Sequence, residues 1–186
     1  MPFLTSLPET AHLADLFHRF PENVAPLMNY TNGVLRGAGA LSVAEREMIA
    51  TYTSGLNACT FCHGSHKAYA VLFGFDADLM DAMIADFDSA PIGDKLRPLL
   101  AYVRKLNTLP SRLTEADARA VYDAGWDEVA LFEAVQVNAL FNMMNRIVEG
   151  AGINFDYADD PERHPANGST PDAHAHSYGA FGKQFT

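Results

Sequence analysis

The chain has 186 residues, of which 48% are hydrophobic and 19% are charged, and its formal net charge is -10. This length and hydrophobic content predict a single folded unit with one substantial core. No run of Lys and Arg supplies the cationic surface that releases counterions from nucleic acid, so we expect neither nucleic acid nor an anionic membrane as a partner.

The N-terminal residues lack a basic leader followed by a long apolar run, and no later stretch reaches the roughly 18 uninterrupted apolar residues that cross a bilayer. We therefore expect a soluble protein of the cytoplasm. The only two cysteines are Cys59 and Cys62. They are too few and too close together for the disulfide framework of a secreted scaffold, and in a cytoplasmic protein such a pair is more often catalytic or metal-binding.

Helical periodicity dominates the chain, and no alternating run bounded by hairpin turns indicates a strand, so the predicted fold is all-α. The first helix is expected over residues 10–20, and the second over 21–35. Ser42 and Glu45 have the spacing of a capping box, which predicts that a third helix starts there and runs to about residue 55.

Asn57 is the expected N-cap of the next helix, which should end at Gly74, a typical residue just past a helix C-terminus. Its first turns carry the side chains of greatest chemical interest: Cys59, Cys62, His63 and His66. Further helices are predicted over residues 76–87, 94–109, 114–124 and 127–149.

The last of these helices is apolar on most sides, which predicts a place in the core or in a subunit interface. One stripe consists of Val129, Phe132, Val135, Ala139, Met143 and Ile147. Three asparagines also recur at helical spacing, and they predict either interhelical hydrogen bonds or the lining of a pocket: Asn138, Asn142 and Asn145. So many short helices and one broadly apolar helix predict a homo-oligomer.

The helical pattern fails from Gly150 onward, where prolines, glycines and aspartates accumulate. We therefore predict a helical domain over residues 1–152 and an irregular C-terminal arm over 153–186. The terminal aromatics of the arm favour docking on the same or a neighbouring subunit, with a frayed tail as the alternative. Its histidines are His164, His174 and His176, and their irregular spacing assigns no metal site.

A carboxylate, two thiols and an imidazole fall within twenty residues across one predicted helix-turn-helix: Glu47, Cys59, Cys62 and His66. Positions three and four apart share a helical face, so the two thiols can approach disulfide geometry and His66 lies one turn beyond Cys62. The helix reversal brings Glu47 back toward that face, where it is placed to accept a proton directly or through one water.

The thiolate is the reactive form of cysteine, and the positive end of a helix favours it. Both thiols lie in the first turns of their helix, and this effect is stronger at Cys59. The base and the imidazole, in contrast, lie beside Cys62. His63 follows Cys62 and faces the Cys59 side, so it is a candidate for tuning that thiol or an ordinary exposed histidine.

The pattern Glu-x11-Cys-x2-Cys-x3-His resembles that of the alkylhydroperoxidase D-like (AhpD-like) proteins of the carboxymuconolactone decarboxylase superfamily, in their peroxidase-related branch. The resemblance implies a reductase of small hydroperoxides that uses no cofactor. Cys62 would attack the peroxide and become a sulfenic acid, and Cys59 would condense with it to a disulfide. Glu47 and His66 would form the proton relay.

The same resemblance implies re-reduction by a thioredoxin-like or lipoyl-type partner and assembly into trimers or hexamers. The best-known members carry a histidine before the second cysteine, where this chain has Phe61. Two other readings of the motif remain open. One is a metal-binding module with Cys59, Cys62, His66 and Glu47 or water as ligands, and the other is a redox sensor whose disulfide changes packing without turnover.

Overall fold

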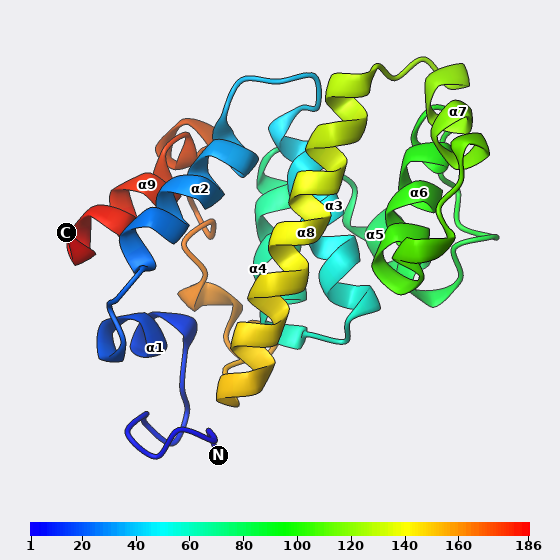
Figure 1. The fold of residues 1–186 in the computed structure, drawn as a ribbon. Helices are drawn as coiled ribbons and strands as arrows, with labels where there is room; N and C mark the ends of the chain where they lie inside the picture. Colours follow the sequence, from blue (N-terminus) through cyan, green and yellow to red (C-terminus); the bar gives the residue numbers. More distant parts are fainter.

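The computed structural model describes residues 1–186 and consists of helices joined by turns and loops, with no strand (Figure 1). The predicted all-α fold is confirmed. The α-helices are α1 (Leu13–Arg19), α2 (Val24–Arg36), α3 (Val43–Leu56), α4 (Thr60–Leu72), α5 (Ala77–Ala85), α6 (Leu96–Thr108), α7 (Glu115–Asp123), α8 (Glu128–Ala151) and α9 (Ser177–Gly182).

Polar side chains start most of these helices where the sequence predicts it. Ser42 and Glu45 form the expected capping box at α3, and Asp127 caps α8. The first two helices begin later than predicted. His12 caps α1 through its ring, and Asn23, which has a left-handed φ of 67°, precedes α2, so the turn that contains Pro21 stays outside both helices.

The expectation that Asn57 caps the cysteine-bearing helix is wrong, because Asn57 ends α3 instead. The chain closes α3 in a Schellman motif, in which Cys59 N–H donates to Ser54 C=O at 3.0 Å and Ala58 N–H donates to Gly55 C=O at 3.0 Å. Ala58 takes the left-handed position, with a φ of 54°. Cys59 consequently becomes the N-cap residue of α4.

Helices α3 and α4 pack closely on each other, and α3 also contacts α5, α6 and α8, so it lies at the centre of the molecule. The long helix α8 crosses the bundle, with α5, α6 and α7 grouped on one side of it and α2 on the other (Figure 1). Buried side chains from all these helices form the main core, in which the inward face of α3 is wholly enclosed.

Helix α8 buries one face and exposes part of another. The buried face includes Leu131, Val137, Phe141 and Val148. Three apolar residues of the predicted stripe are instead open to solvent: Val129 at 50%, Phe132 at 61% and Met143 at 41% exposure. The predicted interhelical role of the asparagines is confirmed, since Asn138 donates to Thr53 Oγ1 at 3.1 Å and Asn145 donates to Ser54 Oγ at 3.0 Å.

The C-terminal segment returns along its own chain and is less irregular than predicted. Phe155 N–H donates to Ala11 C=O at 3.1 Å, and the short helix α9 packs beside α2 (Figure 1). The two helices approach closely at Gly182, where a Cβ would lie only 2.8 Å from Met28 Cβ. No helix of the chain is long and apolar enough to cross a membrane.

Candidate active site

Glu47 of α3 and His66 of α4 form a buried acid–imidazole pair. Glu47 Oε2 lies 2.6 Å from His66 Nδ1, and the carboxylate side chain is fully enclosed. His66 is 9% exposed and packs edge-on against Phe141, with ring centroids 4.4 Å apart. Because Nδ1 is engaged by the carboxylate, Nε2 is the ring nitrogen available for proton transfer.

Two residues that the sequence did not single out complete the surroundings of the carboxylate. Arg36 Nη1 forms an ion pair with Glu47 Oε1, and Arg36 Nε donates to His174 C=O at 3.0 Å. The Tyr178 hydroxyl donates to the same carboxylate oxygen at 3.3 Å. The guanidinium also lies over the Tyr178 ring, 4.9 Å from its centroid.

These partners decide the charge of Glu47. Burial alone raises the pKa of this carboxyl, but His66 and Arg36 outweigh burial and hold the pKa below its usual value. Burial likewise lowers the pKa of Arg36, whereas the Glu47 carboxylate raises it above its usual value. The core therefore contains an ionised carboxylate that is shared by a guanidinium and an imidazole.

The two cysteines are free thiols at the start of α4, and they differ in environment. Cys59 is 0% exposed and Cys62 is 2% exposed. The hydrogen bond with Cys62 and then burial raise the pKa of Cys59 far above its usual value, against the helix-dipole expectation. Cys59 is thus the thiol that keeps its proton, and Cys62 lies one helical turn before His66.

A largely apolar cavity of about 590 Å³ opens on Cys62 and His66. Its walls come from α1, α2, α4, α8 and the C-terminal arm, and Phe61, Phe141 and Tyr178 are among its aromatic members. Cys59 does not line this cavity. The geometry therefore presents one sulfur to a bound molecule and keeps the other behind it.

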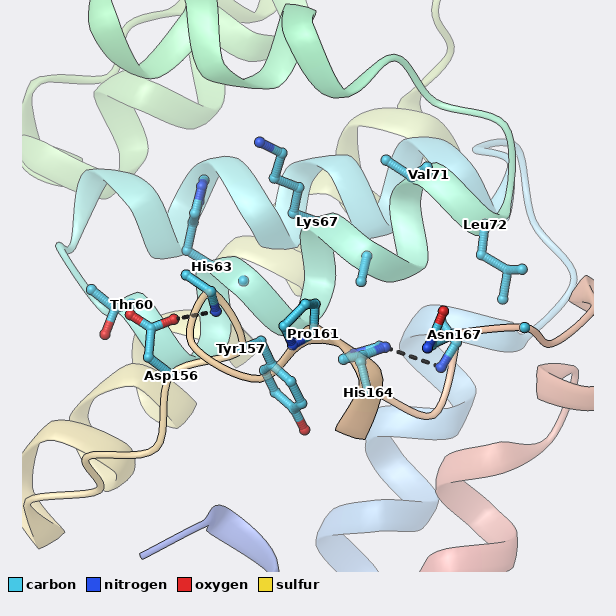
Figure 2. Close-up of a pocket in the computed structure, with 15 residues that line it drawn as sticks. Thr60, His63, Lys67, Val71, Leu72, Asp156, Tyr157, Pro161, His164 and Asn167 are labelled. Atoms are coloured by element: carbon cyan, nitrogen blue, oxygen red, sulfur yellow. Dashed lines mark hydrogen bonds between the residues drawn. The ribbon is translucent and has the colours of Figure 1, made fainter. Parts of the chain in front are cut away.

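A second cavity, of about 710 Å³, lies on the other side of α4 (Figure 2). His63 and Lys67 of α4 line it, together with arm residues such as Asp156 and His164. His63 Nδ1 lies 3.1 Å from Thr51 C=O, so this histidine contacts α3 and does not join the cluster around Glu47.

The histidines of the arm do not gather into a ligand set. His164 Nε2 lies 3.2 Å from Ser65 Oγ, and His174 Nε2 lies 2.9 Å from Ser169 Oγ. No group of three His, Cys, Asp or Glu side chains is placed to hold a metal ion. In particular, Cys59, Cys62 and His66 do not converge on a common point.

The chain is thus a helical bundle with a buried carboxylate–imidazole pair beside a dithiol. Residues 21–104 match the model of the carboxymuconolactone decarboxylase family. This stretch contains Glu47, both cysteines and His66, so the part of the chain that carries the motif is similar to the carboxymuconolactone decarboxylase family, as the motif predicts.

Solved structures share the fold. A peroxidase-related protein from Silicibacter sp. TM1040 is 24% identical, with a TM-score of 0.70 over 76% of this chain and 74% of its own. An alkylhydroperoxidase AhpD core protein from Ralstonia eutropha JMP134 is 22% identical, with a TM-score of 0.71 over 76% of this chain and 75% of its own. A putative antioxidant defence protein AhpD from Agrobacterium tumefaciens is 16% identical, with a TM-score of 0.65 over 81% of this chain and 95% of its own. No curated protein sequence matches the chain.

Proposed function

We propose that this protein is a thiol-dependent peroxidase that reduces small alkyl hydroperoxides through a dithiol–disulfide cycle of Cys59 and Cys62. The observation that carries the proposal is the 2.6 Å contact between Glu47 Oε2 and His66 Nδ1, one helical turn from Cys62 at the wall of the apolar cavity. A general base held in this way is suited to take the proton of a neighbouring thiol.

In the first step, His66 Nε2 accepts the Cys62 proton, and the imidazolium that forms is stabilised by the Glu47 carboxylate. The thiolate attacks the distal oxygen of the hydroperoxide, the O–O bond breaks, and Cys62 becomes a sulfenic acid while the peroxide is reduced to an alcohol. The leaving alkoxide takes up one proton.

In the second step, Cys59 attacks the Cys62 sulfur and loses its own proton. The sulfenic hydroxyl leaves as water with the proton held by His66, and a disulfide forms. A dithiol donor of the thioredoxin-like or dihydrolipoyl class then supplies two electrons and two protons and restores both thiols. The cycle thus balances as two thiols and one hydroperoxide giving a disulfide, an alcohol and water.

The proposal extends to assembly. Val129, Phe132 and Met143 lie on one exposed side of α8 and are the apolar part of that helix that no other element covers. We assign this side to contacts between copies of the chain, in a trimer or hexamer. Sedimentation of the wild-type protein and of Phe132→Glu tests this: the variant should shift toward monomer, and a wild-type monomer at working concentrations contradicts the assignment.

The experiment for the activity combines thiol titration with peptide mass mapping after one equivalent of cumene hydroperoxide. The wild type should lose two thiols per chain and gain a 59–62 disulfide. Cys62→Ser should lose all peroxide consumption, whereas Cys59→Ser should react once and yield a sulfenic acid that dimedone traps at Cys62. A wild-type protein that keeps both thiols in excess hydroperoxide would disprove the proposal.

Multiple turnover separates an enzyme from a redox sensor. With a dihydrolipoyl or thioredoxin-like donor in excess, many equivalents of peroxide should be consumed per chain. Glu47→Gln should slow the first step by about 10²- to 10⁴-fold, the usual contribution of a positioned base. A disulfide that forms but is not reduced by any such donor would favour the sensor reading.

A further inference from the structure

Tyr157 lies in the wall between the two cavities and lines both of them. It follows α8 in the C-terminal arm, is 7% exposed, and packs against Phe61 with ring centroids 5.5 Å apart. Figure 2 shows its hydroxyl at the end of the ring that points away from the labelled α4 residues His63 and Lys67. The hydroxyl contacts His12, which lines the cavity of Cys62 and His66.

His12 fixes one hydrogen bond of this hydroxyl. His12 Nδ1 accepts the backbone N–H of Ala14 at 3.0 Å, and His12 Nε2 lies 2.6 Å from the Tyr157 oxygen. Burial and then the nearby Arg163 lower the pKa of His12, so the ring is neutral. A neutral ring that accepts at Nδ1 carries its hydrogen on Nε2, so His12 donates to the Tyr157 oxygen.

A second chain of hydrogen bonds runs from the arm to Ser65, beside Tyr157, by the same logic. His164 Nδ1 accepts the backbone N–H of Ala166 at 3.0 Å, so its Nε2–H donates to Ser65 Oγ at 3.2 Å. The Ser65 hydroxyl is then left to donate in turn, and Ser65 is close enough to Tyr157 to lower the pKa of that phenol against the effect of burial.

His12 thus donates to the Tyr157 oxygen, and Ser65 is the other hydroxyl near it. A phenol can donate one hydrogen bond besides those it accepts, and the contact with His12 does not use the O–H of Tyr157. No protein acceptor takes that hydrogen among the hydrogen bonds of the structure, and the cavity that holds Cys62 lies beside it. Tyr157 is consequently oriented as a donor toward a bound molecule.

Building on the proposed function, we propose that Tyr157 is the acid that protonates the leaving oxygen of the hydroperoxide, and that His12 and Ser65 are its positioning residues. As the Cys62 thiolate takes the distal oxygen, the proximal oxygen leaves with the electron pair of the O–O bond and accepts the Tyr157 proton. The phenol is then restored when the phenolate takes up, through water, the proton that Cys59 releases as it attacks the sulfenic acid.

The acidity of the group suits this role. Burial raises the pKa of Tyr157 to about 12, so the phenol is protonated at neutral pH and still more acidic than an alcohol. Proton transfer to an alkoxide is therefore favourable. His66 is a weaker candidate for the same step, because the second step needs the proton that its ring takes from Cys62 to release water.

The test uses leaving groups that differ in their need for a proton. Cumene hydroperoxide releases an alkoxide, which needs an acid, whereas peracetic acid releases a carboxylate, which does not. In Cys59→Ser protein, where Cys62 reacts once, adding Tyr157→Phe should slow sulfenic acid formation with cumene hydroperoxide by about 10²-fold. The rate with peracetic acid should stay within twofold of that of the parent variant.

Other outcomes are equally informative. Equal slowing with both oxidants, or no slowing with either, overturns the acid role, and the peracetic acid rate also shows that the site is still folded.

Ser65→Ala should show the same selectivity with a smaller loss, as expected for a positioning residue. Tyr52→Phe, at a buried tyrosine outside this cavity, serves as the control for loss of a phenol. A parent protein that reacts with neither oxidant would instead disprove the proposed peroxidase activity.

Discussion

The hydroxyl of Tyr178 lies 3.3 Å from Glu47 Oε1, although the two residues are 131 positions apart in the chain. Through this contact the C-terminal arm reaches the carboxylate at the centre of the bundle. Arg36 of α2 and His66 of α4 complete the set, so Glu47 joins three separate segments. The contribution of each partner of Glu47 can be measured by replacing that partner alone.

Removal of Arg36 should be the most damaging of these changes. In Arg36→Met, Glu47 keeps His66 but loses the cation beside its other oxygen, and breaking a buried pair typically costs about 3–5 kcal/mol of unfolding free energy. Urea denaturation measures this loss, and Arg119→Met, at an exposed pair with Glu115, should change it by less than about 1 kcal/mol. A stability close to wild type in Arg36→Met would show that the ion pair is not needed to keep Glu47 buried.

Tyr178→Phe should have a smaller and more local effect. Burial and the Glu47 carboxylate raise the pKa of Tyr178 well above its usual value, so the phenol is neutral and donates its hydrogen bond. Losing a hydrogen bond to a charged group costs about 1.5–3 kcal/mol, and the long 3.3 Å distance favours the lower end.

Limited proteolysis should therefore cleave the arm of Tyr178→Phe faster than that of the wild type, with little change in the rest of the bundle. Tyr30→Phe on α2 provides a control, because that side chain is 49% exposed. Identical cleavage rates in the wild type and Tyr178→Phe would mean that other contacts of α9 hold the arm in place.

The short-range features of the fold could be predicted from the sequence because each depends on neighbours in the chain. The capping box of Ser42 and the turn at Gly74, which has a φ of 95°, are examples. The end of α3 near residue 55 was predictable, but the N-cap of α4 escaped prediction because Ala58 takes the left-handed position that glycine or asparagine usually marks. Asn57 is a residue type that favours an N-cap, but its side chain instead bonds to Asn107 and Asn145.

The candidate site also has residues whose places the sequence predicts and residues whose places it does not. Glu47, Cys62 and His66 lie within one helix-turn-helix, so their spacing predicts their proximity. Arg36 and Tyr178 are linked to Glu47 only through tertiary packing, and no local pattern distinguishes them from ordinary core or surface residues. Their places could be found only once α2 and the arm were seen to close over α3.

The two thiols should differ in reactivity even before any peroxide is added. The hydrogen bond with Cys62 and burial raise the pKa of Cys59, and only Cys62 lines the cavity. Iodoacetamide under reducing conditions should therefore modify Cys62 first, as shown by peptide mass mapping over time. In Cys62→Ser, Cys59 should remain slow. Faster modification of Cys59 would indicate that the helix N-terminus dominates and would exchange the roles of the two sulfurs.

His164 should make the protein less stable in mild acid. Burial, and then the neighbouring His66, lower the pKa of His164 to about 4 from 6.5. Below pH 6.5 the unfolded chain binds a proton that the folded protein does not, so the unfolding free energy falls as the pH drops toward 4. A shift of this size corresponds to a loss of about 2–3 kcal/mol over that interval.

His164→Asn tests this directly, since the Asn oxygen can still accept the Ala166 N–H without titrating. Urea denaturation at pH 7, 6, 5 and 4 should give a shallower decline for the variant than for the wild type. His176→Asn, at an exposed histidine of the same arm, should keep the wild-type slope because its ring lies in solvent in both states. Parallel curves for the wild type and His164→Asn would show that the buried imidazole does not resist protonation.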